Sequence, residues 1–334
     1  MGTLYVTQSD SFVGKLDERL TVKFEKKNIL DVPLIKVDGI VILGRATISP
    51  AVVYELLSRH IPLTFLTETG RYLGRLEPEL AKNIFLRKAQ WKAAENSPIA
   101  ICAVQSFVRG KLKNYRNIMV RRQRESAELD LSKNITQLEN TIAPIDTREN
   151  IDSLRGLEGA GSAAYFGGFD QMIRSTEFKF TRRVRRPPTD PVNSLLSFGY
   201  SLLRHDIQGA VNIVGFDPYL GYLHCDRYGR PSLALDLMEE FRPLVVDAMV
   251  LSTLNKELLK PEDFETEPLS NAVTLTKEGR KTFLKLYTQK KQTTFTHPVM
   301  KRKCTYQEAF EIQARLFAKY LMGQTDKYPP LIRW

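Results

Sequence analysis

The chain has 334 residues, of which 43% are hydrophobic, enough for two domains or one large domain with buried cores. Lys and Arg outnumber Asp and Glu by 49 to 38, and the net charge of +11 favours a polyanionic partner, nucleic acid first, over a generically basic soluble protein. The amino terminus has no cationic segment followed by an apolar core, and no run approaches the ~20 apolar residues of a membrane span, so we expect neither secretion nor membrane insertion.

Three cysteines, Cys102, Cys225 and Cys304, are widely spaced and form no CxxC pair. This odd number and spacing predict neither a disulfide framework nor a zinc knuckle. We therefore expect a cytoplasmic protein that keeps its thiols reduced.

Short apolar runs separated by turn residues occupy the beginning of the chain: TLYVT, RLTVKF, VPLIKVDGIVIL, IPLTFLT and RYLGRL. These runs predict strands, with Asp38 and Gly39 as a turn signal. One helix is expected at SPAVVYELLSRH, where Ser49 precedes Pro50. Residues 1–86 are therefore predicted to form a compact β-rich domain.

Helical periodicity replaces the strand pattern in the rest of the chain. SPIAICAVQSFVRGKLKNYRNIMVRRQRE predicts an amphipathic, basic helix because its apolar residues recur every three or four positions. Asp146 and Glu149 resemble a capping box before a helix in IDSLRGLEGAG, and further helices are expected in NSLLSFGYSLLRHDIQGAVNIV and TYQEAFEIQARLFAKYL. LKPEDFETEPLSN is expected to be a loop. The predicted fold class is α+β, with a larger, mainly α-helical domain over residues 87–334.

Four side chains form a candidate catalytic site for phosphodiester chemistry: Glu158, His224, Asp236 and Glu239. Such chemistry uses a divalent cation to neutralise the nonbridging oxygens and to position the attacking hydroxyl. Two carboxylates and an imidazole tolerate Mg²⁺ and suit Mn²⁺ somewhat better, so Glu158, His224 and Glu239 are the expected metal ligands. Asp236 lies three residues before Glu239, on the same helical face, and is assigned as an auxiliary ligand or water holder.

Each of these residues also has a plain structural interpretation. A single Glu on a helix is usually solvated, but Glu158 stands beside the small residues of GAGSAAYFGG, which permit close approach. A single His is usually a structural hydrogen-bonding residue. Asp236 and Glu239 would face the apolar side of their helix, which is costly unless they are paired or metal-bound.

The spacing of Gly159, Gly161 and Ala164 also matches a dinucleotide-binding fingerprint. That motif requires a preceding strand, whereas IDSLRGL upstream has helical spacing. Close packing explains these small residues better.

Basic segments supply candidate contacts to DNA. Arg109 to Arg124 contains seven Lys or Arg and no acid, and Arg174 to Pro188 contains six against Glu177 alone. Aromatic residues are interleaved with both runs, which favours phosphate contact over a merely solvated face. The expected DNA-binding residues are Arg109, Lys111, Arg182, Arg183 and Arg186. Lys277 to Lys303 is also basic, and we interpret it as a solubilising surface.

Three sequence motifs together resemble the CRISPR adaptation integrase, or CRISPR-associated endonuclease, the larger core subunit of the spacer-acquisition machinery. The motifs are LRGLEGAGSAAYFGGF, RRPPTDPVNSLLSFGYSLL and GYLHCDRYGRPSLALDLMEEFRP. The resemblance covers nearly the whole chain. It implies that Glu158, His224 and Glu239 bind Mg²⁺ or Mn²⁺, with Asp236 as a nearby acid. Many relatives have Pro where this chain has Glu240, an extra acid expected to alter metal affinity slightly.

The same resemblance implies a β-sandwich-like amino-terminal domain that forms a homodimer, and a small ferredoxin-like adaptation subunit that bridges two dimers. The implied reaction joins the 3′-hydroxyl of a short double-stranded DNA fragment to a phosphodiester of a CRISPR repeat, and water in place of the hydroxyl gives nuclease activity. Two alternatives stay open: a general metal-dependent nuclease acting on branched DNA in repair, and a non-catalytic DNA-binding scaffold.

Overall fold

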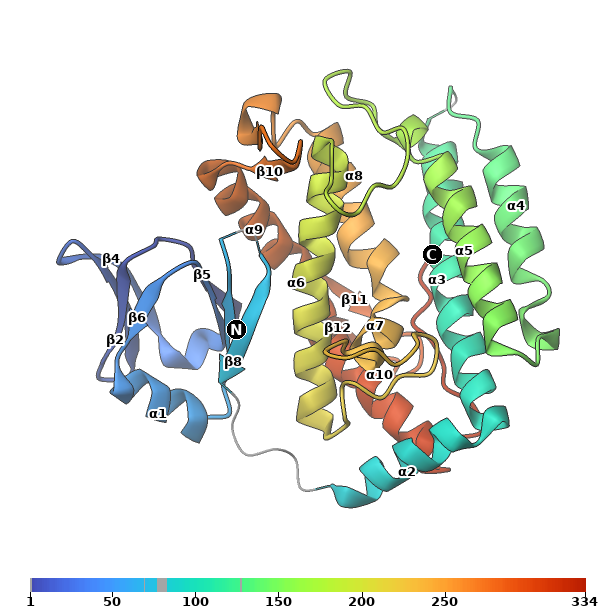
Figure 1. Cartoon of the computed structure of the whole chain (residues 1–334), viewed down its shortest axis with the longest axis horizontal. Coiled ribbons are helices and arrows are strands. Elements are labelled where there is room, and N and C mark those ends of the chain that lie inside the picture. Colours follow the sequence, from blue (N-terminus) through green and yellow to red (C-terminus); the bar gives the residue numbers. More distant parts are fainter. Residues whose placement is uncertain (1, 69, 77–82, 127) are drawn as a thin grey trace. The chain divides into compact units, whose positions relative to one another are not determined.

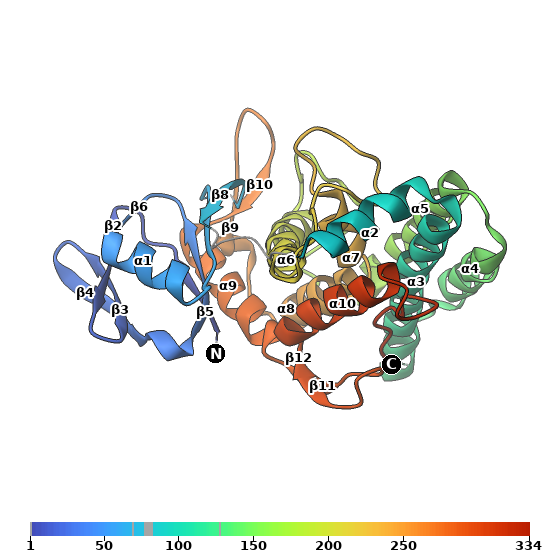
Figure 2. The ribbon, with the colours of Figure 1, turned by 90° about the horizontal axis from the view of Figure 1, so that it is seen from below.

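The computed structural model describes residues 2–68, 70–76, 83–126 and 128–334 (Figures 1 and 2). The chain divides into two units, Met1–Leu80 and Ala81–Trp334. Residue 86, where we expected the first domain to end, lies within α2 (Ile84–Glu95), the first helix of the second unit. The α+β class, with a β-rich amino-terminal part and a helical remainder, is confirmed.

Two four-stranded sheets build the first unit. One has the order β1 (Gly2–Val6), β5 (Val37–Leu43), β7 (Leu63–Leu66), β8 (Tyr72–Leu76), and the other the order β4 (Lys27–Pro33), β3 (Arg19–Phe24), β2 (Ser11–Leu16), β6 (Ala46–Ile48). The strands of the first sheet are parallel except for β8, whereas β2, β3 and β4 form an antiparallel meander.

Both sheets contribute to a single apolar core. Val13 and Leu20 of one sheet cluster with Ile40 and Leu63 of the other, and helix α1 (Pro50–Ser58) adds to the same cluster. Burial of such side chains from two facing sheets is the main stabilising contribution of a sandwich-like unit. As predicted, Ser49 caps α1 by accepting a hydrogen bond from the amide of Val52.

The turn predicted at Asp38 and Gly39 is wrong, because both residues lie inside β5. This strand pairs on one side with β1 and on the other with β7. Two hydrogen-bonded ladders therefore override the local turn preference of the Asp-Gly pair.

In the described part of the second unit there are nine α-helices, α2 to α10 (Figure 1). Besides α2 these are α3 (Ser97–Glu125), α4 (Ser132–Ile142), α5 (Ile151–Gly167), α6 (Pro191–Val214), α7 (Ser232–Met238), α8 (Ala248–Asn255), α9 (Lys277–Lys291) and α10 (Tyr306–Leu321). Helices α3, α4 and α5 pack on one another, and α6 packs against α7 and α10. No helix in the described ranges is long and apolar enough to cross a bilayer.

Two local expectations in this unit are corrected. The cap of α5 is Asn150, whose side chain accepts from the amides of Asp152 and Ser153 at 2.7 and 3.3 Å, whereas the predicted capping residue Asp146 lies in an earlier 3₁₀ turn. The expected loop after Lys260 contains a short strand, β9 (Phe264–Thr266), paired with β10 (Val273–Leu275). A second small hairpin joins β11 (Thr294–Thr296) to β12 (Lys303–Thr305).

Helices α3 and α5 approach closely where α5 has a glycine. A Cβ atom on Gly161 would stand 2.4 Å from Cδ2 of Leu112 on α3. The small-residue patch therefore permits the close approach that its composition predicts. This approach allows the preceding turn of α5, which carries Glu158, to face Lys111 of α3.

Candidate metal centre

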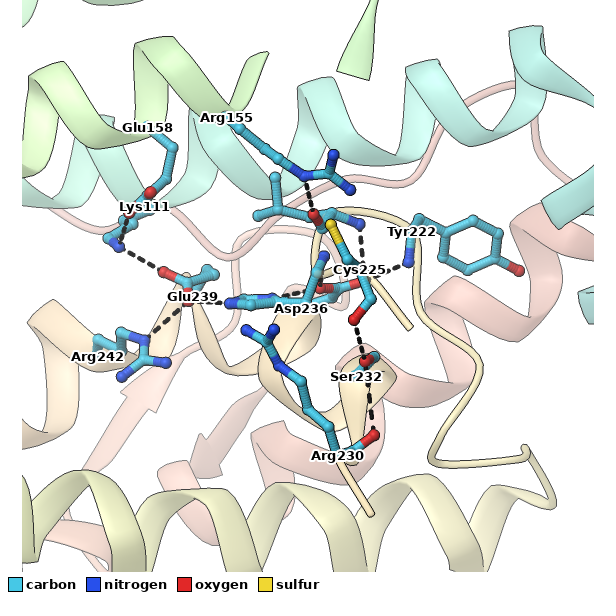
Figure 3. A network of polar contacts seen from close by, with 12 residues as sticks. Lys111, Arg155, Glu158, Tyr222, Cys225, Arg230, Ser232, Asp236, Glu239 and Arg242 are labelled. Carbon is cyan, nitrogen blue, oxygen red and sulfur yellow. Dashed lines mark hydrogen bonds and ion pairs between the residues drawn. The ribbon is translucent and has the colours of Figure 1, made fainter. Parts of the chain in front are cut away.

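The four predicted site residues come from three separate segments of the second unit and lie together. Figure 3 labels Glu158, Asp236 and Glu239. Glu158 projects from α5, His224 from the loop between α6 and α7, and Asp236 from α7. Glu239 is the residue that ends α7. A fifth side chain, Lys111 of α3, connects Glu158 to Glu239.

Lys111 places its ammonium between the two carboxylates. It donates a hydrogen bond to Oε1 of Glu158, and its Nζ atom lies 2.6 Å from Oε2 of Glu239. The side chains of Lys111 and Glu239 are each 4% exposed. Oε2 of Glu239 is buried, and its ion pair with Lys111 holds it in place. Buried charges of this kind are tolerated only in pairs or networks.

Two further side chains face Glu239. Arg242 donates from Nε to Oε1 at 2.9 Å, and Nε2 of His224 lies 3.8 Å from the same oxygen. Burial raises the pKa of Glu239, but the charges of Arg242 and Lys111 outweigh that effect and hold the pKa well below its usual range. Glu239 is therefore a carboxylate at every physiological pH.

Asp236 organises the loop that carries His224. Its Oδ2 atom accepts from the amides of Tyr222 and Leu223 at 2.6 and 3.0 Å. Its Oδ1 atom accepts from the amide of His224 at 3.0 Å and pairs with Nδ1 of the same residue at 2.6 Å. Because a carboxylate only accepts, Nδ1 carries the proton, and the lone pair of Nε2 is left facing Glu239.

The role expected for Asp236 therefore changes. The side chain is fully buried, and both oxygens already accept hydrogen bonds from the loop. We assign it to positioning His224, in place of auxiliary metal ligand or water holder. Gly221 makes this wrapping possible, since a Cβ atom there would stand 2.6 Å from Cβ of Ser232 and 2.9 Å from Oδ2 of Asp236.

Residues outside the predicted set also hold this loop. Gln90 of α2 is fully buried and donates to the carbonyls of Asp217 and Leu220 at 2.8 and 2.9 Å, while its Oε1 atom accepts from the amide of Asp217 at 2.9 Å. Arg155 of α5 donates to the carbonyl of Leu223 at 2.6 Å. No local pattern marks Gln90 or Arg155 in the sequence, because their partners are backbone atoms more than 60 residues away.

A buried acid lies in the segment that follows α7. Asp247 is fully buried and accepts from the hydroxyl of Tyr200 at 2.6 Å. Burial raises its pKa to about 7, although the hydrogen bond from Tyr200 and the charges of Arg242 and Lys111 oppose that rise.

The donors of this site suit a divalent cation. In the described part of the chain, no three His, Cys, Asp or Glu side chains come close enough to form a ready-made metal shell. Two carboxylates nevertheless converge on one buried cationic position, and the bare Nε2 of His224 faces one of them. Hard oxygens with one imidazole nitrogen are appropriate for Mg²⁺ or Mn²⁺. Binding such an ion requires Lys111 to yield part of this position.

The basic residues expected to contact DNA fall into different environments. Arg182 and Arg186 are exposed, and Arg109 is partly exposed and paired with Asp146. The interpretation of Lys111 as a DNA contact is corrected, because its ammonium is buried between the carboxylates. Arg183 is partly buried and donates to Oδ1 of Asn193 and Oγ of Ser197 at 2.7 and 3.0 Å on α6, and its contact with DNA stays a prediction.

Glu240 also points away from the proposed ligands. It accepts from Nε2 of Gln313, the hydroxyl of Tyr328 and the amide of Leu331, each at 2.8 Å. Burial raises its pKa to about 7 against these three hydrogen bonds. Glu240 therefore anchors the carboxy-terminal segment, and the expectation that it alters metal affinity as a neighbouring acid is replaced by this structural role.

Known proteins are similar to this chain in sequence and in fold. Over residues 4–289 the chain matches the family described as CRISPR associated protein Cas1. A CRISPR-associated endonuclease Cas1 of Rhodospirillum rubrum is 38% identical over 340 residues, and one of Chlorobaculum tepidum is 36% identical over 338; each alignment covers 99% of this chain and 98% of the relative.

Solved structures of the same fold extend over the whole chain. A casposase bound to its integration product is 20% identical, with a TM-score of 0.86, and the match covers 100% of this chain and 95% of that one. A CAS1 protein from Thermotoga maritima is 24% identical, with a TM-score of 0.82, covering 98% and 99%. Because the family match spans most of the sequence and the relatives align over almost their full length, this chain belongs to the CRISPR associated protein Cas1 family.

Proposed function

We propose that this protein is a metal-dependent DNA integrase and endonuclease that inserts short DNA fragments into a CRISPR array. The observation that carries the proposal is that Glu158 and Glu239 meet at the ammonium of Lys111, while Nε2 of His224 lies 3.8 Å from the other oxygen of Glu239. Curated relatives at 36% and 38% identity are named endonucleases, and a structure with the same fold is titled a casposase bound to its integration product.

The proposed ligands of Mg²⁺ or Mn²⁺ are Glu158, His224 and Glu239. When bound, the ion supplies positive charge to the nonbridging oxygens of the scissile phosphate. Asp236 holds the His224 ring in the tautomer that leaves Nε2 free, and Arg242 keeps Glu239 ionised. These residues are therefore organised for binding before the DNA arrives, which lowers the reorganisation cost of the reaction.

The reaction exchanges one phosphodiester for another. The 3′-hydroxyl oxygen of the fragment forms a bond to phosphorus and loses its proton, while the bond from phosphorus to the oxygen of the original strand breaks and that oxygen gains a proton. With water as the nucleophile, the same exchange is hydrolysis. Arg109, Arg182 and Arg186 are proposed to hold backbone phosphates of the duplex.

The partners we propose are double-stranded DNA, a second copy of this chain bound through the β-rich unit, and a small ferredoxin-like adaptation subunit. Solved Cas1 relatives are titled as part of a Cas6-RT-Cas1–Cas2 complex, which supports a hetero-complex for this chain too. We propose a cytoplasmic location, where the CRISPR array and the reduced thiols of this chain would both be found.

Strand transfer into a supercoiled plasmid that carries a CRISPR array tests this function. The wild-type protein, with its partner subunit and Mn²⁺, is expected to join a labelled fragment covalently at a repeat boundary. Glu158→Gln and His224→Ala should abolish joining and cleavage while duplex binding persists. Cleavage of branched DNA without any joining would favour a repair nuclease, and unchanged DNA processing by both variants would favour a non-catalytic scaffold with contaminating activity.

A further inference from the structure

Several cations gather around the ring of Tyr306, at the start of α10. Nζ of Lys290, on α9, lies 5.1 Å from the ring centroid, and Cζ of Arg333, in the carboxy-terminal segment, lies 5.6 Å from the same centroid. Arg333 also donates to the hydroxyl of Tyr306 at 2.5 Å. One aromatic side chain therefore brings together two positive charges from segments that are far apart in the sequence.

Two further arginines act on neighbouring groups, Arg121 on Lys290 and Arg302 on Cys304. Burial, together with the charges of Arg333 and Arg121, lowers the pKa of Lys290 to about 8. Arg302, in the turn between β11 and β12, and Arg333 both oppose the rise that burial produces in the pKa of Cys304. We name Arg121, Lys290, Arg302 and Arg333 the Tyr306 cluster.

The tail that supplies Arg333 is held in place along α3, where the carboxy terminus lies in both views (Figures 1 and 2). The amide of Arg333 donates to Oδ1 of Asn114 at 3.0 Å, and its carbonyl accepts from Nδ2 of Asn117 at 2.9 Å. Its guanidinium stacks over Phe295 at 4.4 Å. The position of this charge is therefore fixed before any ligand arrives.

Neighbouring acids compensate this positive charge only in part. Among the described residues, no carboxylate forms an ion pair with Lys290 or Arg333. Glu125, which lies 3.6 Å from Arg121, is shared with Arg122. Glu308 accepts from the amide and hydroxyl of Thr305 at the start of α10.

A purely solubilising surface would let these side chains extend into water, but Lys290 and Arg333 are only partly exposed. Holding like charges close together costs free energy that a bound anion recovers. Lys301, Arg302 and Lys303 beside them are exposed and extend the positive surface. Guanidinium groups with a nearby ammonium are the usual partners of phosphate oxygens.

We propose that the Tyr306 cluster binds backbone phosphates of duplex DNA, as a contact made of residues other than those of the metal centre. This inference rests on the proposed function, since it assigns a second surface to the same DNA substrate. It gives a role to the basic run from Lys277 to Lys303, which its sequence alone did not distinguish from a solubilising surface.

The dissociation constant of the full-length protein for a fluorescent duplex, measured between low and high KCl, tests the proposal. Lys290→Gln and Arg302→Gln are each expected to weaken binding and to reduce the slope of log K against log salt by about one. Lys285→Gln is the matched control, because Lys285 is exposed on α9 but lies outside the cluster. Thermal melting confirms that each variant is folded, and Arg302, in an exposed turn, is replaceable even if Lys290→Gln is not tolerated.

The proposal is overturned if both cluster variants behave like Lys285→Gln in a wild-type protein that still binds and joins DNA; the proposed function then stands. It is also overturned by a competition experiment with polyglutamate of equal charge. If polyglutamate displaces the labelled duplex from wild type more effectively than unlabelled duplex does, and has no such advantage with the variants, the partner is an acidic protein. If wild-type protein does not bind duplex at all, both this inference and the proposed function fail.

Discussion

Nδ1 of His224 lies 2.6 Å from Oδ1 of Asp236, and this contact determines which nitrogen of the imidazole is available. The same carboxylate accepts the amide of His224 at 3.0 Å, so the ring and its backbone are oriented by one residue. Hydrogen bonds that orient a metal-binding histidine in this way typically raise metal affinity by roughly 10- to 100-fold.

Asp236→Asn is expected to weaken Mn²⁺ binding by about 10- to 100-fold, because an amide nitrogen would face an N–H donor and disturb the His224 tautomer. Calorimetric titration with Mn²⁺ measures this loss, and duplex binding should be unchanged. Asp226→Asn is the matched control, since Asp226 is exposed on the same loop. Equal Mn²⁺ affinity in Asp236→Asn and wild type would contradict the positioning role.

Lys111→Met is expected to destabilise the protein by about 3–5 kcal/mol, because the buried Glu239 loses one of its cationic partners and faces Glu158 across the gap. Added Mn²⁺ should raise the melting temperature of the variant more than that of wild type, since the metal no longer competes with the ammonium. Lys113→Met serves as the control, since Lys113 lies two residues further along the same helix and is partly exposed. An identical Mn²⁺-induced shift in wild type and Lys111→Met would argue against a shared cationic position.

Gln90→Leu should loosen the loop that leads to His224. The substitution leaves the carbonyls of Asp217 and Leu220 without their donor, each unsatisfied group costing roughly 1–3 kcal/mol. Hydrogen exchange of residues 216–224 is expected to accelerate, with a parallel loss of Mn²⁺ affinity. In Gln289→Leu, where the side chain is exposed on α9, exchange in this loop should match wild type. If hydrogen exchange of the loop is as slow in Gln90→Leu as in wild type, Gln90 does not hold this loop in place.

Asp247 is expected to make stability depend on pH. Its folded-state pKa of about 7 exceeds the unfolded value of about 3.9, so the native state binds this proton more tightly. The contribution is therefore complete below about pH 4 and is lost as the pH rises to about 7, a change of at most about 4 kcal/mol. The groups that act on it are Tyr200 from α6, Lys111 from α3, Arg242 and Arg183.

Urea unfolding at pH 5 and pH 8 checks the sign of this effect. Wild type should lose more free energy of unfolding between these pH values than Asp247→Asn, whose amide cannot ionise. The difference between the two proteins isolates Asp247 from other titrating groups, such as Glu240. A wild-type protein that loses no more stability than the variant would show that Asp247 is not protonated in the native state.

Some features follow from local patterns in the sequence. The strand runs of the β-rich unit, the helix capped by Ser49 and the late helix α10 were predicted because hydrophobic periodicity and capping depend on residues a few positions apart. The cap of α5 was misplaced from Asn150 to Asp146, since several polar residues there are equally suitable locally. Asp38 and Gly39 are locally typical of a turn. They lie in a strand because β5 pairs on both sides with strands that are distant in the sequence.

By itself the sequence determined the α+β composition, the family and the candidate ligands Glu158, His224 and Glu239, because hydrophobic periodicity and the short motif around each ligand can be seen in the sequence directly. Only the tertiary structure decided that Lys111 stands between two carboxylates instead of on a DNA-facing surface, and that Asp236 supports His224. A basic residue on a helix has the same local pattern whether it faces water or a buried acid, and the close approach of α3 and α5 at Gly161 selects between the two.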